Sequence, residues 1–390
     1  MLFQDRYLAV VLSGAAGEPS DDLDGKTALQ AAPTPYLDAL AGAAEVGCVE
    51  LPERADPSRP ETSVAALLGA ERTSIPHGPL MGAALGVGPG DRDVCFRCEF
   101  VATDGEKLLG PTGRMPEAQE RTLISLVQEK LSTRRLRVVP GDGGLHLIVW
   151  TEGPRDLECS APEEAKGLPI RQALPRGDGE EVLRRFLDDC LNLLHDHPVN
   201  REREGDELPP AHLLWPYENG ITPALRPFAL RWGMAGGAVS TAPEVCGLAR
   251  LLGMTVAGPT GADADYAAVL KAGLCTLRSH GFVLLHITTC RAAAQRGDAT
   301  ELAYTLRDLD TRLIARLCEA QATDGFRLLL VCDAAKASGA PMLYLLSPGE
   351  TAGRRPPFDE RIATDGGFPP VAAEAMMSKL LQPTSVWRNQ

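Results

Sequence analysis

The chain has 390 residues, 44% hydrophobic and 23% charged, which is ordinary for a globular protein, and its length favours two domains over one. A formal net charge of −13 disfavours nonspecific binding to nucleic acid or to an anionic membrane, since both are polyanions. No apolar run approaches the roughly 18 residues that cross a bilayer, and the ten scattered cysteines suit reduced core thiols. We therefore expect a cytoplasmic protein with no membrane or nucleic-acid partner.

The first predicted strand, residues 7–12, runs into the glycine-rich segment SGAAGEP at residues 13–19. Turns at the carboxyl ends of strands are where α/β proteins place their sites. A metal-using α/β enzyme would carry a carboxylate at the start of this turn, but Ser13 stands there. The turn is therefore a candidate site whose expected acid is missing.

Further short apolar runs predict strands at residues 46–51, 145–150, 282–287 and 326–332. Amphipathic helices are predicted in EEVLRRFLDDCLNLLHDH (180–197) and ELAYTLRDLDTRLIARLCEA (301–320), where apolar residues recur at helical spacing. Strands that alternate with such helices indicate a three-layer α/β fold with a mainly parallel sheet.

The middle of the chain breaks this alternation. Glycine- and proline-rich joints such as LLGPTGRMP and VVPGDGGLH surround strand-like pieces there. We expect a smaller α+β cap domain at residues 91–198, inserted into an α/β core made of residues 1–90 and 199–390.

Seven stretches occur in one order along nearly the whole chain: LDGKTALQAAPTPYLDALA (23–41), ALGVGPGDRDVCFRCEF (84–100), HPVNRER (197–203), LLWPYENGITPAL (213–225), LARLLGMTVAGPTGADADY (248–266), RDLDTRL (307–313) and FDERIATDGGF (358–368). Together they resemble the archaeal-type, cofactor-independent (2,3-bisphosphoglycerate-independent) phosphoglycerate mutases of the alkaline phosphatase superfamily. The resemblance implies an alkaline-phosphatase-like core with an inserted cap. It also implies a glycolytic isomerase in which two divalent metals, such as manganese, flank a serine that takes the phosphoryl group.

The first two catalytic motifs of that family are altered here. Where the family has D-G-x-x-D-x-P, this chain has SGAAGEP, so Ser13 and Gly17 stand at the acidic places. The nucleophile motif P-G-S-D corresponds to SRPETSVAALLGA (58–70), with Pro60 at the serine and Glu61 at the aspartate. Proline has no hydroxyl, so this alignment excludes a phosphoserine. A one-residue shift would instead promote one of three hydroxyl residues: Ser58, Thr62 or Ser63.

The last two motifs are altered as well. In HITTCRAAAQRGD (286–298), Arg291 replaces an aspartate and Gln295 replaces a histidine. In CDAAKASGAPMLYLL (332–346), Asp333 is kept, Ala334 replaces a histidine, and the loop for a final histidine is shortened. A guanidinium repels a metal dication and a single carboxylate does not hold a pair of ions, so we expect no metal cofactor.

Substrate-side positions of the family are matched unevenly, and Arg97, Arg114, Asn200 and Arg203 lie in the better matched stretches. Five residues are candidates for binding a small anion: Arg97, Arg114, Asn200, Arg203 and Arg291. Ordinary ion pairs on the protein surface are the competing explanation for such arginines.

We interpret the chain as a phosphoglycerate-mutase-like pseudoenzyme with a binding, scaffolding or regulatory role, whose partner is a small anionic ligand or another protein. Two alternatives stay open. One is an active phosphoglycerate mutase whose metal ligands and nucleophile lie at positions other than those aligned above with the family motifs. The other is a different enzyme that uses Arg291 and Asp333 as new polar groups.

Overall fold

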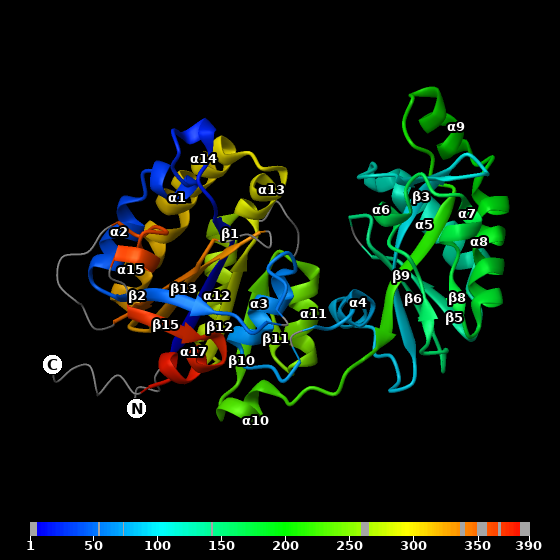
Figure 1. Ribbon diagram of the computed structural model, residues 1–390. Helices are drawn as coiled ribbons and strands as arrows, with labels where there is room; N and C mark the ends of the chain where they lie inside the picture. Colours follow the sequence, from blue (N-terminus) through cyan, green and yellow to red (C-terminus); the bar gives the residue numbers. More distant parts are fainter. Residues whose placement is uncertain are drawn as a thin grey trace. The chain divides into compact units, whose positions relative to one another are not determined.

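The computed structural model describes residues 6–53, 55–72, 74–141, 143–258, 265–335, 340–348, 357–365 and 368–382 (Figure 1). The chain divides into a core unit, Met1–Ser74 with Leu225–Gln390, and an inserted unit, Ile75–Ala224. The inserted unit extends beyond the expected limits of 91 and 198 at both ends. The reason is that helix α4 (His77–Ala84) packs on its sheet and strand β9 (Leu213–Ile221) belongs to that sheet.

An eight-stranded sheet forms the centre of the core unit, in the order β11-β10-β12-β1-β13-β14-β2-β15. Strand β1 pairs in parallel with both β12 and β13, and β10 pairs in parallel with β11 and β12, whereas β14 is antiparallel to both of its neighbours. The strands are β1 (Tyr7–Ala16), β2 (Glu45–Glu50), β10 (Gly236–Ser240), β11 (Thr255–Val256), β12 (Phe282–Ile287), β13 (Arg327–Ala334), β14 (Met342–Ser347) and β15 (Phe368–Ala372). The predicted α/β fold class with a mainly parallel sheet is confirmed.

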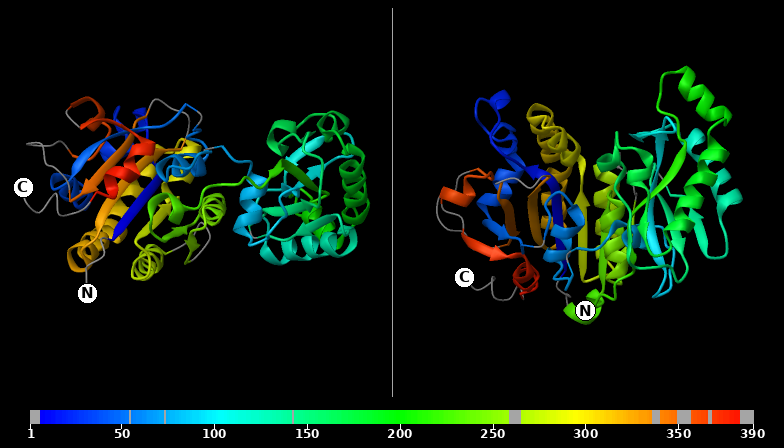
Figure 2. Two further views of the ribbon diagram at one scale, coloured as in Figure 1. Left: turned by 90° about the horizontal axis from the view of Figure 1, so that it is seen from below. Right: turned by 45° about the vertical axis from the view of Figure 1, so that its right-hand side comes forward.

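Helices cover both faces of this sheet (Figures 1 and 2). Alternate residues of β1, namely Leu8, Val10 and Leu12, share one apolar cluster with α1, α2, α12, α14 and α15, and the other face carries α3, α11 and α17. The helices of the core unit are α1 (Ala28–Ala31), α2 (Pro35–Gly42), α3 (Pro60–Leu67), α10 (Phe228–Trp232), α11 (Pro243–Leu251), α12 (Tyr266–Leu277), α13 (Thr289–Arg296), α14 (Ala299–Leu309), α15 (Ala315–Asp324), α16 (Ile362–Asp365), α17 (Ala373–Leu380) and a short 3-10 turn, η1 (Asp21–Leu23).

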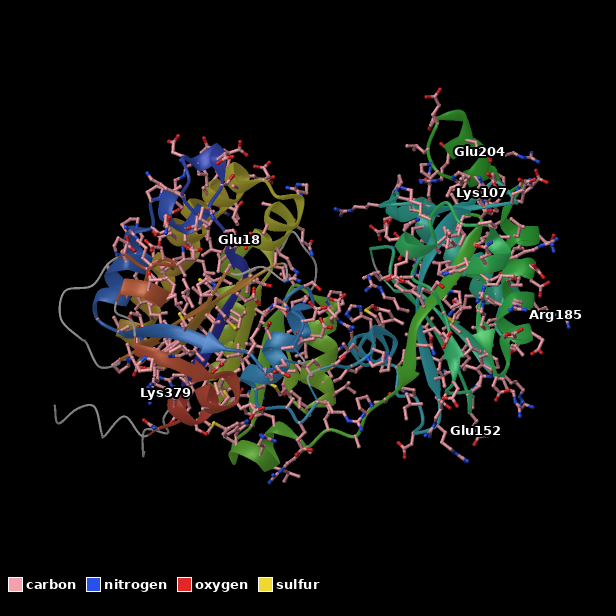
Figure 3. All side chains as sticks on the ribbon, in the orientation of Figure 1. Glu18, Lys107, Glu152, Arg185, Glu204 and Lys379 are labelled. Carbon is pink, nitrogen blue, oxygen red and sulfur yellow. The ribbon has the colours of Figure 1, made fainter. Side chains whose placement is uncertain are left out.

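The inserted unit is built on a five-stranded antiparallel sheet, in the order β4-β3-β6-β5 with β9 also paired to β3. Leu183, Phe186 and Leu187 of α8 are buried against it, whereas Arg185 on the same helix extends outward to solvent (Figure 3). Its remaining elements are β3 (Val94–Thr103), β4 (Leu108–Pro111), β5 (Leu136–Val139), β6 (His146–Trp150), β7 (Leu157–Glu158), β8 (Arg176–Gly177), α5 (Glu117–Leu131), α6 (Pro162–Ala165), α7 (Ile170–Ala173), α8 (Glu180–Leu194) and α9 (Pro198–Gly205).

The long amphipathic segment at 301–320 is interrupted by a π-helical turn, η2 (Asp310–Ile314), between α14 and α15. The buried carboxylate of Asp310 accepts hydrogen bonds from the backbone N–H groups of Tyr36 (3.2 Å) and Leu37 (2.8 Å), at the start of α2. Asp310 therefore caps a helix that is distant in the sequence. Throughout the described part of the chain, helices long and apolar enough to cross a bilayer are absent.

Candidate functional site

The candidate site lies where three neighbouring parallel strands of the core unit end. Ser13 lies in β1, Asp333 lies near the end of β13, and Arg291 lies in the first turn of α13, which follows β12. Since β1 lies between β12 and β13, the topology brings these three segments together at one sheet edge. Three of the positions that the resemblance singled out therefore meet in the structure.

The carboxylate of Asp333 is buried and anchored to the end of β1, which runs to Ala16 and so includes Ser13 and Gly14, where the sequence predicted a turn. Its Oδ1 accepts a hydrogen bond from the backbone N–H of Gly14 at 2.7 Å, and the hydroxyl of Ser13 lies 3.4 Å from its Oδ2. Burial raises the pKa of Asp333 to about 6, against the lowering effects of the Gly14 hydrogen bond, the charge of Arg291 and the Ser13 hydroxyl.

The guanidinium of Arg291 is directed into the protein, and the residue is only 7% exposed. Its Nη1 donates to Oγ of Ser13 at 3.1 Å, and its Nη2 donates to the backbone carbonyls of Pro57 (3.2 Å) and Ser58. Burial lowers the pKa of Arg291, and the nearby carboxylates, Asp333 first, act in the opposite direction. The Arg291 side chain thus joins α13, the end of β1 and the segment before α3.

The motif that would carry a nucleophile forms the start of α3. Pro60 is the first residue of this helix, where its missing N–H costs nothing, and Glu61 follows it and is buried. Oε1 of Glu61 accepts a hydrogen bond from Nε of Arg59 at 2.8 Å, and the Glu61 charge influences both Arg291 and His286. This position therefore contributes a carboxylate to the candidate site.

The three hydroxyl residues of the shifted alignment have different surroundings. Thr62 donates to the backbone carbonyls of Asp56 (2.7 Å) and Arg59 (2.8 Å), and the Ser63 side chain is fully buried. Ser58 is exposed, and its carbonyl oxygen accepts from Arg291. None of these contacts pairs a hydroxyl with a general base.

The remaining substituted positions have different surroundings. Gln295 is exposed on α13, and Ala334 is buried opposite Ala16 in the pairing of β13 with β1. The backbone N–H of Gly17 donates to Oε1 of Glu360 at 3.0 Å. The shortened loop after Ala334 falls partly on residues 336–339, outside the described residues.

Three polar residues near the site were not among the candidate site residues from the sequence: Ser240, His286 and Glu360. Oγ of Ser240, at the end of β10, lies 3.0 Å from Nδ1 of His286 at the end of β12, and both side chains are buried. Burial lowers the pKa of His286 to about 3, and the positive charge of Arg291 acts in the same direction. Glu360 also accepts from the hydroxyl of Thr27 at 2.5 Å, which ties the C-terminal segment to the Gly17 turn.

A pair of divalent metal ions does not fit the residues at this site. A guanidinium lies beside the Ser13 hydroxyl and points at the oxygens that a cation would need. Among the residues that the structure describes, no group of three or more His, Cys, Asp or Glu side chains is arranged to hold a metal ion. Asp333 is thus a lone carboxylate of the expected ligand set.

Asn200 and Arg203 of the inserted unit have their polar atoms engaged within the fold. The Asn200 amide donates to the carbonyls of Leu194 (2.8 Å) and Ala211 (3.0 Å) and accepts from the Ala211 N–H at 2.8 Å. The buried Arg203 donates to Pro209 O (2.9 Å), Gln119 Oε1 (3.3 Å) and Thr112 O (3.4 Å). These contacts hold α9 against the rest of the inserted unit. They explain Asn200 and Arg203 better than the binding of an anion does.

Arg97 and Arg114 are less buried than Asn200 and Arg203. Arg97 lies over the ring of Tyr217, at 5.3 Å from its centroid, and its Nη1 is 2.8 Å from Nδ1 of His77 and 3.8 Å from the Glu218 carboxylate. Arg114 is exposed. Both belong to the inserted unit and Arg291 to the core unit, so the anion-binding candidates do not form one cluster within either unit.

Comparison with known proteins gives one consistent result. A sequence model described as 2,3-bisphosphoglycerate-independent phosphoglycerate mutase matches residues 41–200. The chain is 30% identical over 343 residues to the mutase of that name from Methanopyrus kandleri, covering 80% of this chain and 79% of the relative. It is 28% identical over 383 residues to a probable mutase of the same kind from Geobacter sulfurreducens, covering 93% of this chain and 96% of the relative.

A solved structure agrees with these relatives. The cofactor-independent phosphoglycerate mutase from Thermoplasma acidophilum superposes with a TM-score of 0.64 at 25% sequence identity, covering 97% of this chain and 99% of that chain.

Proposed function

The chain belongs to the 2,3-bisphosphoglycerate-independent phosphoglycerate mutase family, and from this we propose that it is a non-catalytic member with a binding, scaffolding or regulatory role. The observation that supports the proposal is the arrangement of Arg291, Ser13 and Asp333. A guanidinium donates to the Ser13 hydroxyl beside the one carboxylate that the resemblance would assign to a metal. In an active site of this kind the same region needs divalent cations.

The chemistry explains why these substitutions matter together. In-line transfer of a phosphoryl group between oxygens needs cations that clamp the attacking and leaving oxygens, and a hydroxyl whose pKa is lowered so that it attacks. Pro60 offers no hydroxyl, and Arg291 holds a guanidinium against the Ser13 hydroxyl, in the region where the resemblance implies metal ligands. Without a serine and metal ions, the covalent capture of the phosphoryl group and the metal activation of the attacking hydroxyl are both lost.

The role that we propose instead is the binding of a small anionic ligand or of a protein partner. Arg97 and Arg114 of the inserted unit stay candidates for an anion, because one is half-buried on an aromatic ring and the other is exposed. Asn200, Arg203 and Arg291 are weaker candidates, because all three residues are buried and their side chains donate to oxygens of the protein itself.

Metal analysis combined with a mutase assay tests the proposal. Purified protein is dialysed against chelator and analysed for manganese, cobalt, zinc and magnesium, and then assayed for conversion of 3-phosphoglycerate to 2-phosphoglycerate with added manganese or cobalt. The Methanopyrus kandleri relative serves as the positive control. We expect no tightly held metal and no turnover above background. A chelator-sensitive turnover would instead establish the alternative, an active mutase.

A further inference from the structure

We infer that the Arg291 guanidinium is an internal cation that fills an oxygen-lined cation site at the carboxyl ends of β1 and β13, and so takes the place of a metal ion in holding this region together. The inference rests on the proposed function, because it assumes that the wild-type site takes no metal. It goes further by assigning Arg291 a stabilising role and by predicting that a cation site reappears when the guanidinium is removed.

The atoms around the guanidinium are oxygens of the kind that bind hard cations. They are the Ser13 hydroxyl at 3.1 Å, the Pro57 carbonyl at 3.2 Å and the Ser58 carbonyl, with the carboxylate of Asp333 beside Ser13. Backbone carbonyls, hydroxyls and carboxylates are ordinary ligands of calcium and manganese. The guanidinium donates N–H groups to the Ser13, Pro57 and Ser58 oxygens instead.

The charges near Arg291 also match a cation site. Four carboxylates favour its charged form: Asp333, Glu61, Glu244 and Asp56. Asp333 and Glu61 are themselves buried. A positive charge nearby favours the ionised form of a buried carboxylate such as Asp333. Glu61 is also paired with Arg59 at 2.8 Å, so the carboxylate that Arg291 chiefly offsets is that of Asp333.

The fold leaves little freedom in where this cation lies. A Cβ added at Gly14 would lie 2.6 Å from the Cα of Arg291, so the first turn of α13 rests directly on the end of β1. The Arg291 side chain begins at that contact and reaches across to the segment before α3. One side chain thereby joins three segments that are far apart in the sequence, as a bridging metal ion does.

Thermal unfolding of matched variants tests the inference. R291A removes the guanidinium, and R296A removes an exposed arginine on the same helix that pairs with the exposed Glu301. In chelator we expect the Tm of R291A to fall by about 5–10 °C and that of R296A to stay within about 1 °C of wild type. Manganese or calcium at about 1 mM should raise the Tm of R291A by at least about 3 °C relative to an equal ionic strength of sodium chloride.

A second variant keeps the test decisive if R291A folds poorly. S13D/R291D adds two carboxylates beside Asp333, and manganese should raise its Tm by more than that of R291A, while wild type and R296A show no shift. The inference is overturned if both site variants respond to manganese and calcium no more than R296A does, or if R291A is as stable as wild type. A manganese-dependent shift in wild type would instead count against the proposed function, so the two failures are distinguishable.

Discussion

Gly14 and Arg291 are in direct backbone contact: a Cβ built at Gly14 would lie 2.6 Å from the Cα and 3.0 Å from the backbone nitrogen of Arg291. Gly14 also has a φ of +80°, which L-residues with a side chain rarely adopt. G14A should therefore lower the free energy of unfolding by about 2–4 kcal/mol, because neither the contact nor the dihedral angle accommodates a methyl group. Urea denaturation followed by circular dichroism measures the loss.

Gly17 supplies the control for this substitution. It lies just past the end of β1, and a Cβ there would meet no heavy atom within 4 Å. G17A should change the free energy of unfolding by less than about 1 kcal/mol. If G14A lowers the free energy of unfolding no more than G17A does, then α13 does not rest on the end of β1 as described.

Restoring the missing hydroxyl should not restore catalysis. In P60S, a serine would begin α3 at the position that the resemblance assigns to the nucleophile. Its hydroxyl would still lack a metal to lower its pKa, since Arg291 and Asp333 are unchanged. Turnover of 3-phosphoglycerate by P60S in manganese or cobalt should equal that of wild type. Chelator-sensitive turnover in P60S would show that the metal site is intact and that the proposal is wrong.

Much of the fold could be predicted from the sequence, because it depends on local patterns. The apolar run at 282–287 gives β12 with the predicted bounds, and the helical spacing in 180–197 gives α8 at Glu180–Leu194. The π-helical turn at Asp310 was not predicted, since the apolar period runs through it. Its buried carboxylate caps α2 through a contact that no local pattern records.

The candidate site could be predicted only in part, for a related reason. The resemblance assigns Ser13, Arg291 and Asp333 to one site, and the hydrogen bonds among their side chains show that they are indeed neighbours. The partners of Arg291 in the segment before α3 are backbone carbonyls. Every residue type carries a backbone carbonyl, so the sequence does not mark these two as partners. Glu360 reaches Gly17 across more than three hundred residues, so no spacing could indicate it.

The pH dependence of stability should show the burial of His146 in the inserted unit. Its Nδ1 accepts from the Gly141 N–H at 3.2 Å, its Nε2 lies 3.4 Å from Oε1 of Glu120, and the side chain is fully buried. Burial lowers the pKa of His146 from 6.5 to about 4. Between pH 6.5 and pH 4 the unfolded chain binds this proton more readily than the folded protein does. The free energy of unfolding therefore falls as the pH drops from 6.5 towards 4, and the stability contributed by neutral His146 is fully present above pH 6.5.

Replacing His146 with asparagine isolates this contribution, because the amide oxygen can accept from Gly141 in place of Nδ1. Between pH 7 and pH 5, wild type should lose about 2 kcal/mol more of its free energy of unfolding than H146N does. Urea denaturation at both values measures the difference. From pH 7.5 to 9 the two proteins should change in parallel. Equal losses on acidification would mean that His146 is protonated in the folded protein.

Arg203 should prove to be a structural residue of the inserted unit and not an anion ligand. It is 2% exposed, and its side chain donates to Pro209, Gln119 and Thr112, which join α9 to the start of α5 and to the end of β4. Burial lowers the pKa of Arg203. R203M should lower the free energy of unfolding by about 1–3 kcal/mol, because methionine leaves these three acceptors, of which the Thr112 carbonyl belongs to a buried residue, without their donor. R201M is the matched control, since Arg201 lies on the same helix with an exposed side chain paired to the exposed Asp196, and it should cost less than about 0.5 kcal/mol.

Binding of 3-phosphoglycerate, measured by calorimetry on both folded variants, should be unchanged from wild type. A selective loss of binding in R203M would return Arg203 to the set of anion ligands.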